Sequence, residues 1–315
     1  MIYTELQEIK DISKICFGTL ALSTLQNQAS IGEKVNVLNY AYEKGINFYD
    51  TAELYENYDV LGEFLKGKDR KSIYLASKSY AYNYDTAKFS IDKALSELGT
   101  DYIDFFMLHE QDNGNNFRGH REAVEQFMRY KEEGIIKKFG ISTHAIQAVR
   151  DSVEFDDIDI VFAIYNATGI GIADGSSAEM LEAMKFAKSK GKFIMDMKPY
   201  GGGHFTSDTK YAFNFVNKEK SIDSIAVGMK NTAEVDVNLS YLLGEEPSEE
   251  ALRRVSNIPR KLCIAYWCEG CGKCVERCKQ NALSIKNGKC EVDMSKCVLC
   301  SYCADACESF CIKIV

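Results

Sequence analysis

The chain has 315 residues, of which 46% are hydrophobic and 27% are charged, and it contains only three prolines. This composition is that of a globular protein, and the length allows one large domain and one small domain. The formal net charge of −8 argues against nucleic acid as a partner. The amino-terminal residues show no secretory signal, and no apolar stretch is long enough to span a bilayer. We therefore expect a cytoplasmic protein without a membrane span.

Residues 1–245 alternate short apolar runs with longer amphipathic stretches. The apolar runs predict eight strands, at 12–18, 46–50, 72–78, 102–109, 137–142, 158–165, 193–198 and 222–227. Apolar residues spaced i, i+3, i+4 predict helices between them, for example at 32–44, 84–98, 121–133, 176–190 and 232–243. Near-continuous apolar strands are typical of a parallel sheet that helices cover on both faces. Eight such units predict an α/β fold with a (β/α)8 TIM barrel over residues 1–245, and a doubly wound open sheet is the alternative.

A charged stretch with a proline ends this pattern, and it predicts a linker or short helix over residues 246–262. Eight of the twelve cysteines follow in two copies of the spacing C-x2-C-x2-C-x3-C. This spacing is typical of paired [4Fe-4S] clusters, in which the fourth cysteine of each run binds the other cluster. We therefore predict one cluster on Cys268, Cys271, Cys274 and Cys307, and a second on Cys278, Cys297, Cys300 and Cys303. Structural zinc and a disulfide knot are alternatives that the spacing disfavours.

Residues 263–315 resemble a bacterial two-cluster ferredoxin, which implies a small α+β domain. Lys279 and Glu308 stand where such runs usually continue with proline, but this departure leaves the ligands intact. Cysteines that bind metal indicate a reducing cytoplasm, and the oxygen sensitivity of exposed clusters favours an anaerobic host. The other four cysteines have no partner spacing and are predicted to be buried: Cys16, Cys263, Cys290 and Cys311.

Reactive side chains stand at three successive predicted strand ends, where TIM barrels carry their catalytic residues. Asp50 closes the second strand, Lys78 the third and His109 the fourth, and Tyr55 follows Asp50 by five residues. Each has an ordinary explanation alone, as a helix cap, a solvated lysine, a core histidine or one of eighteen tyrosines. Their occurrence together predicts an active site. His144, at the end of the fifth strand, is a further candidate to face it.

The run from Phe48 to Tyr55 resembles the DTAxxY motif of the aldo-keto reductases. Further matches are Ala76-Ser77-Lys78, the stretch from Asp101 to His109, Gly18-Thr19 and 140–144. The resemblance covers residues 12–243 and is closest to the branch with a carboxyl-terminal ferredoxin-like extension. It implies an oxidoreductase that reduces a small aldehyde or ketone to an alcohol, or catalyses the reverse reaction.

The physical roles of the four residues follow from the charge that builds on a carbonyl oxygen during reduction. Tyr55 would donate the proton, and Lys78 would lower the pKa of Tyr55 by stabilising its anion. Asp50 would hold Lys78 by an ion pair, and His109 would orient the carbonyl oxygen.

The resemblance also implies a nicotinamide cofactor at the carboxyl ends of the strands. The positions that match are Gly18, Thr19, Ser142, Lys198, Gly201, Gly202, Gly228, Lys230 and Asn238. The glycine run after Lys198 either wraps a pyrophosphate with its N–H groups or is a flexible loop. Phe162 stands where a glutamine is usual and Met197 where an aromatic ring is usual. Glu234 replaces an arginine that contacts the 2′-phosphate, which favours NADH over NADPH or no nicotinamide at all, although Lys230 could compensate.

Two halves with different electron chemistry leave several interpretations open. Clusters transfer one electron at a time, whereas hydride transfer moves two. We favour an NAD(P)H-dependent carbonyl reductase whose clusters are structural or dock a redox partner such as ferredoxin or flavodoxin. The alternative is a nicotinamide-independent reductase, in which the clusters deliver single electrons to a substrate held by Tyr55, Lys78 and His109. A flavin that links the two halves and a non-enzymatic electron carrier are further interpretations.

Overall fold

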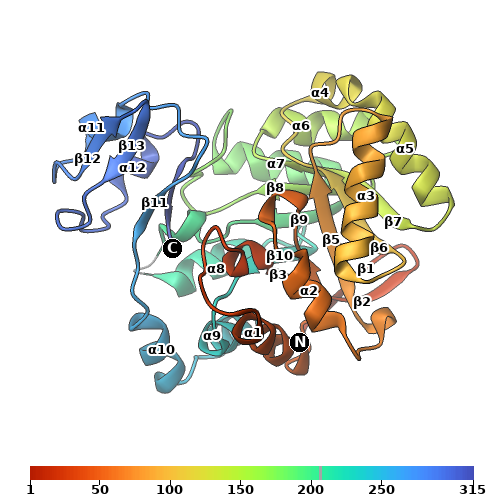
Figure 1. The fold of residues 1–315 in the computed structure, drawn as a ribbon, viewed down its shortest axis with the longest axis horizontal. Helices are drawn as coiled ribbons and strands as arrows, with labels where there is room; N and C mark the ends of the chain where they lie inside the picture. Colours follow the sequence, from red (N-terminus) through yellow and green to blue (C-terminus); the bar gives the residue numbers. More distant parts are fainter. Residues whose placement is uncertain (206–207) are drawn as a thin grey trace.

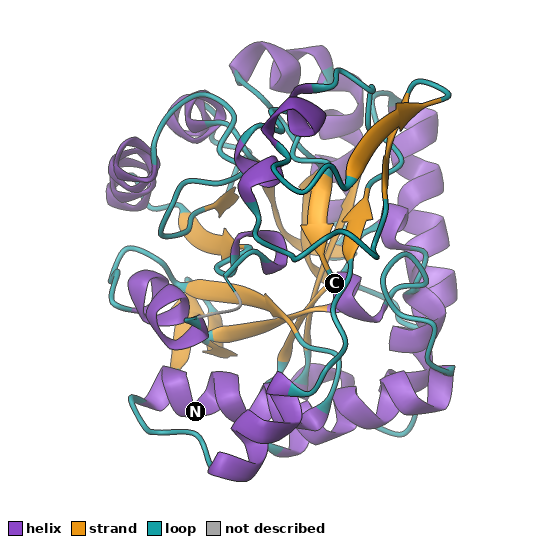
Figure 2. Ribbon diagram, turned by 90° about the vertical axis from the view of Figure 1, so that its left-hand side faces the viewer, coloured by secondary structure: helices purple, strands orange, loops and turns teal. Residues whose placement is uncertain are grey.

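A computed structural model describes residues 1–205 and 208–315 of the chain. Eight parallel strands form a closed barrel in the order β10-β3-β4-β5-β6-β7-β8-β9, with helices around it (Figure 1, Figure 2). They are β3 (Ile15–Gly18), β4 (Phe48–Asp50), β5 (Tyr74–Ser79), β6 (Ile103–Leu108), β7 (Ile136–Thr143), β8 (Ile160–Ile164), β9 (Phe193–Met197) and β10 (Ser224–Gly228). The predicted (β/α)8 barrel is confirmed, and the open-sheet alternative is wrong because β10 pairs with β3 and closes the sheet.

The helices of the outer layer begin and end where the sequence carries capping signals. They are α1 (Ile31–Glu43), α2 (Tyr58–Leu65), α3 (Tyr84–Leu98), α4 (Gly114–Gly119), α5 (Arg121–Glu132), α6 (Ile146–Asp151), α7 (Ser177–Ser189), α8 (Thr209–Asn217), α9 (Thr232–Leu243) and α10 (Glu249–Ser256). Ser30 and Ser176 form capping boxes with Glu33 and Glu179, which satisfy free N–H groups of the first turn. The five predicted helices match within one residue at each end.

The barrel interior is a packed core that leaves only the carboxyl end of the barrel for chemistry. Alternate strand residues such as Phe48, Phe105 and Met195 point inward and contact each other. The amino-terminal hairpin, β1 (Tyr3–Leu6) and β2 (Ile9–Ser13), adds Leu6 and Ile12 to this cluster and covers its amino end. The single strand predicted at 12–18 is therefore two strands separated by Lys14.

Residues 262–315 form a separate small core beside the barrel (Figure 1, blue). Its elements are β11 (Leu262–Ile264), α11 (Lys273–Arg277), β12 (Leu283–Lys286), β13 (Lys289–Val292), α12 (Tyr302–Asp305) and β14 (Ile312–Ile314). β11 pairs with β14 and β12 pairs with β13, both antiparallel. We call residues 262–315 the tail. The domain boundaries predicted from the sequence and the likeness to a ferredoxin stay predictions.

The tail packs on the carboxyl end of the barrel at a turn of three glycines, η5 (Gly201–Gly203). A side chain at Gly203 would collide with the carbonyl of Ile314, and one at Gly202 would press on Lys313 and Phe310. His204 adds hydrogen bonds from its ring to Ser301 Oγ and the Ile312 carbonyl, both at 3.0 Å. Glycine is therefore required here for the close approach of the tail. Within the described ranges, no helix is long and apolar enough to cross a membrane.

Candidate active site and cysteine-lined cavities

The four predicted catalytic residues meet at the carboxyl end of the barrel. Asp50 ends β4, Lys78 lies near the end of β5, His109 follows β6, and Tyr55 lies on the turn η2 (Glu53–Tyr55). Lys78 forms an ion pair with Asp50 and also donates to the Thr51 carbonyl at 2.8 Å. The Lys78 Nζ lies 5.2 Å from the centre of the Tyr55 ring, and the Tyr55 and His109 ring centres are 6.0 Å apart.

Burial sets the protonation states at this site. It raises the pKa of the Tyr55 phenol well above its ordinary value, and the negative charge of Asp50 adds to this effect. The direction is opposite to the expected lowering by Lys78, because burial disfavours the phenolate more strongly than the nearby ammonium group favours it. Burial and the nearby Lys78 ammonium hold the pKa of His109 well below its ordinary value. Tyr55 therefore keeps its proton at neutral pH, and His109 is neutral.

Two neighbours that the sequence analysis did not identify hold this arrangement in place. Tyr80 stacks on His109 with ring centres 4.6 Å apart, so that His109 contacts aromatic rings on both sides. Asn57 accepts from the Thr51 hydroxyl at 2.7 Å and donates to the Thr19 carbonyl at 2.9 Å. These bonds tie the turn that carries Tyr55 to the ends of β3 and β4. Tyr80 comes two residues after Lys78, and this position near the end of a strand could have identified it as a residue of the site.

The predicted nicotinamide contacts lie at the carboxyl ends of the strands, but the protein itself already uses several of them. Thr19 donates to the Asp50 carbonyl at 2.8 Å, and Ser142 accepts from the Glu110 N–H at 3.0 Å. Asn238 accepts from the Tyr200 hydroxyl at 2.5 Å and donates to the Glu234 carbonyl at 2.7 Å. A nicotinamide cofactor would have to displace some of these bonds in order to use the same groups.

The glycine turn does not have the geometry expected of a pyrophosphate cradle. The N–H of Gly201 donates to the Lys198 carbonyl at 2.8 Å, and that of Gly203 donates to the Tyr200 carbonyl at 3.0 Å. These two donors are engaged within the turn, and the tail covers it from outside. The N–H groups of Gly201 and Gly203 are therefore not free to wrap a pyrophosphate. The role of Gly202 and the alternative of a flexible loop stay predictions.

The position of Glu234 changes the argument about the type of nicotinamide. Its carboxylate is engaged, because it accepts from the Lys230 backbone N–H at 2.6 Å at the start of α9. Burial raises the pKa of Glu234, and the positive charges of Arg260 and Lys230 oppose that rise. Arg260 was not identified from the sequence. Basic groups beside a carboxylate that already accepts a hydrogen bond remove the main reason to exclude NADPH.

Two further predicted nicotinamide contacts, Gly18 and Gly228, lie next to each other at the ends of the neighbouring strands β3 and β10.

The other two departures lie inside or beside the barrel core. Phe162 points into the barrel interior, and Lys78 Nζ lies 5.0 Å from the centre of its ring. Met197 ends β9 and contacts the same interior cluster. An apolar ring at Phe162 cannot donate or accept the hydrogen bonds that a glutamine would make to a carboxamide.

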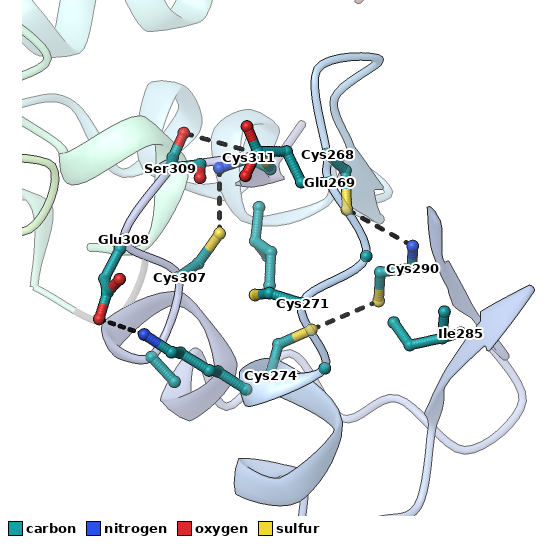
Figure 3. Close-up of a pocket in the computed structure, with 15 residues that line it drawn as sticks. Cys268, Glu269, Cys271, Cys274, Ile285, Cys290, Cys307, Glu308, Ser309 and Cys311 are labelled. Atoms are coloured by element: carbon teal, nitrogen blue, oxygen red, sulfur yellow. Dashed lines mark hydrogen bonds and ion pairs between the residues drawn. The ribbon is translucent and has the colours of Figure 1, made fainter. Parts of the chain in front are cut away.

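The eight predicted cluster ligands of the tail lie in two cavities. The first cavity is lined by Cys268, Cys271, Cys274 and Cys307 (Figure 3), and the second by Cys278, Cys297, Cys300 and Cys303. This is the division that the spacing predicts. Cys290 and Cys311, which have no place in that spacing, also line the first cavity, and Cys16 is buried in the barrel interior. Cys263 lies on β11 and is only partly buried.

Backbone N–H groups point at two sulfurs of the first cavity. The N–H of Cys311 donates to Cys307 Sγ at 3.2 Å, and that of Cys290 to Cys268 Sγ at 3.4 Å (Figure 3). Within residues 1–205 and 208–315, no group of three or more His, Cys, Asp or Glu side chains is placed to hold a single metal ion.

The barrel and its site define the class of this protein. Residues 14–268 match the model of the Aldo/keto reductase family, and the chain belongs to that family. It is 32% identical over 163 residues to the uncharacterized oxidoreductase YqkF of Bacillus subtilis, a match that covers 47% of the chain and 50% of YqkF. It is 22% identical over 308 residues to the L-galactose dehydrogenase of Arabidopsis thaliana, which covers 82% of the chain and 94% of that enzyme.

Solved structures show the same fold. An aldo-keto reductase from Bacillus halodurans superposes with a TM-score of 0.65 at 19% identity, covering 81% of this chain and 95% of that one. An aldo-keto reductase from Klebsiella pneumoniae in complex with NADPH gives a TM-score of 0.63 at 19% identity, with coverage of 81% and 95%.

Proposed function

We propose that the barrel reduces a small aldehyde or ketone to an alcohol, with Tyr55 as the proton donor. The observation that carries this proposal is the convergence of a protonated Tyr55, a neutral His109 and the Lys78–Asp50 ion pair at one end of the barrel. Relatives named for carbonyl reduction support it, such as the methylglyoxal reductase DkgB of Salmonella typhi, which is 26% identical over 213 residues.

Each residue has a physical task in this reaction. His109 donates a hydrogen bond to the carbonyl oxygen and orients it beside the Tyr55 hydroxyl. Tyr55 transfers its proton to that oxygen as negative charge builds there. The nearby Lys78 ammonium, fixed by Asp50, then stabilises the phenolate that Tyr55 becomes. NADH or NADPH, when bound, supplies the hydride.

A pair of tyrosine variants tests the proposal. Tyr55→Phe removes only the hydroxyl, and we expect kcat/KM for carbonyl reduction to fall by about 10²–10⁴-fold. Tyr82→Phe is the matched control, because Tyr82 is 60% exposed and far less confined. Near-normal reduction by Tyr55→Phe protein would refute the assignment of the proton donor.

We also propose that the tail is a ferredoxin-like domain with two [4Fe-4S] clusters. The support is the donor set, since four predicted ligands line each of the two cavities and backbone N–H groups donate to two sulfurs of the first cavity. The domain divisions proposed are 1–245, 246–262 and 263–315. The clusters would exchange single electrons with a redox partner such as ferredoxin or flavodoxin. A cytoplasmic enzyme of an anaerobe fits this chemistry.

The junction between tail and barrel favours one second candidate function. Phe310 follows the predicted ligand Cys307 by three residues, and its ring lies 5.6 Å from His144 and 5.2 Å from Lys198 Nζ at the barrel mouth. In this candidate the clusters supply the electrons one at a time and no nicotinamide binds. The engaged nicotinamide contacts described above also support it. Isotope transfer from NADH separates the two candidates.

A further inference from the structure

Two lysines from different parts of the chain meet at the junction of barrel and tail. Lys198 directly follows β9, and Lys313 lies on β14. The Lys313 Nζ lies 2.7 Å from the centre of the Phe310 ring, and the Lys198 Nζ lies 5.2 Å from the same centre. The Lys198 ammonium group is close enough to lower the pKa of Lys313, so the two positive charges repel.

Neither lysine has an acidic partner in the part of the chain that the structure describes. Lys198 Nζ contacts His144 Nε2 at 2.7 Å, and Lys313 donates to the Phe310 carbonyl at 2.6 Å. Burial lowers the pKa of both lysines, that of Lys198 to about 8. Glu110 and Asp50 offset this shift for Lys198, and Cys307, Cys311 and Glu110 offset it for Lys313, but none of these groups forms an ion pair with either lysine. Two desolvated ammonium groups without a counter-ion are unfavourable unless an anion joins them.

His144 fixes the direction of Lys198. Its Nδ1 contacts the Gly171 carbonyl at 2.9 Å, which places a proton on Nδ1 and leaves Nε2 to accept from Lys198. Burial and Lys198 hold the pKa of His144 well below its ordinary value, so the ring stays neutral. Lys198 itself has a φ of +60°, a strained conformation for a residue with a side chain. His144 is therefore a positioning residue.

Lys198 also lies within electrostatic range of the proposed catalytic residues. Its positive charge lowers the pKa of His109 and of Asp50. A molecule whose carbonyl lies at Tyr55 and His109 could therefore extend to Lys198, which lies beside the same Phe310 ring as Lys313.

We propose that Lys198 and Lys313 bind the carboxylate of the substrate, so that the enzyme acts on oxo acids. The inference deepens the proposed carbonyl reduction and rests on it for the position of the carbonyl. The pyrophosphate of a nicotinamide is the other source of anionic oxygen. We assign the lysines to the substrate because the Gly201 and Gly203 N–H groups of the turn beside them donate to carbonyls of the same turn, and the tail covers that turn. Lys313 makes the tail part of the substrate site.

Binding to full-length Tyr55→Phe protein tests the inference without turnover. The probes are pyruvate and 4-oxopentanoate, which differ in reach, and their uncharged counterparts acetone and 2-pentanone, measured by calorimetry. We expect at least one oxo acid to bind about tenfold or more tightly than its ketone, as expected when a buried charge pair forms. Lys313→Met and Lys198→Met should each abolish that preference. Lys261→Met is the control, because Lys261 is an exposed lysine directly before the tail.

Several results would overturn the inference about the two lysines. Equal binding of acid and ketone, no binding of either oxo acid, or a preference that survives both lysine variants would each refute it. Lysine-dependent binding of inorganic pyrophosphate without oxo-acid binding would assign the site to a cofactor. Hydrogen exchange of β14 shows whether a lysine variant displaces the tail. Lys198→Met provides a second variant of the site, because Lys198 belongs to the barrel and not to the tail. Oxo-acid binding by wild-type protein that fails to reduce any carbonyl would refute the proposed function alone.

Discussion

The buried ion pair between Lys78 and Asp50 makes a quantitative prediction about stability. Lys78 is 1% exposed and the Asp50 side chain 5% exposed, so neither charge has access to water. Asp50→Asn leaves the ammonium group with the Thr51 carbonyl as its remaining partner. Loss of one member of a buried pair destabilises a protein by about 3–5 kcal/mol, because the other charge stays buried and uncompensated. We expect the free energy of unfolding to fall by that amount for Asp50→Asn at pH 7.

Lys78→Met should have an effect of similar size, and it should depend on pH. Burial already raises the pKa of Asp50, and removal of Lys78 removes the effect that opposes this rise. A carboxyl group whose pKa is raised in the folded state destabilises when pH rises through that pKa. Lys78→Met should therefore recover stability as pH falls toward the ordinary value of 3.8 and below it, where the carboxyl becomes protonated in both states.

A double-mutant cycle completes the test. The variant with both Asp50→Asn and Lys78→Met contains no unpaired charge, so it should be more stable than either single variant. The assay is urea denaturation at pH 7 followed by far-ultraviolet circular dichroism. If the two effects simply add in the double variant, the charges are not coupled and the account of the pair is wrong.

Three further predictions concern the site and the tail. The kcat/KM for carbonyl reduction should show no titration at the ordinary pKa values of 6.5 for histidine and 10 for tyrosine. His109 is already neutral at pH 6.5, and Tyr55 is still protonated at pH 10. A pH profile of kcat/KM that bends at either value would contradict this prediction. Cys271→Ala should lower iron from about eight to about four atoms per chain in anaerobically purified protein, whereas Cys311→Ala should not; equal iron in both would disprove the ligand assignment. Gly203→Ala should release β14 and increase the hydrogen exchange of its backbone amides. Gly67→Ala is the control and should not do so, because Gly67 also has a positive φ but lies in open space. If the β14 amides stay protected in Gly203→Ala, the close contact between Gly203 and β14 is unnecessary.

The barrel could be predicted because its signals are local. Apolar runs and capping residues specify each strand and helix, and strand ends in a barrel converge on one face whatever the loops do. This is why Asp50, Lys78 and His109 could be brought together from their positions in the sequence. The helices α2, α4, α6 and α8 were given no bounds from the sequence, because they are short and show few turns of apolar periodicity.

The junction could not be predicted because it depends on contacts between residues far apart in the sequence. Nothing in the run after Lys198 shows that its glycines make room for Ile314 and Lys313. The raised pKa of Tyr55 was not predicted, since the sequence identifies Lys78 and its pairing with Asp50 but not the depth at which Tyr55 is buried. Short-range sequence patterns identify the helices, the strands and the spacing of ligands. The burial of a titratable side chain and the packing of the tail on the barrel depend instead on the three-dimensional arrangement of distant residues.

The most direct test of the central claim follows the hydrogen that reaches the carbonyl carbon. The full-length protein, kept anaerobic, reduces 4-oxopentanoate or an uncharged aldehyde with NADH carrying deuterium at both hydrogens of C4, and mass spectrometry locates the label in the alcohol. The account of a hydride-transferring reductase predicts one deuterium on the carbinol carbon. An alcohol without deuterium would contradict it, because that hydrogen would then come from solvent and the electrons would reach the substrate by another route.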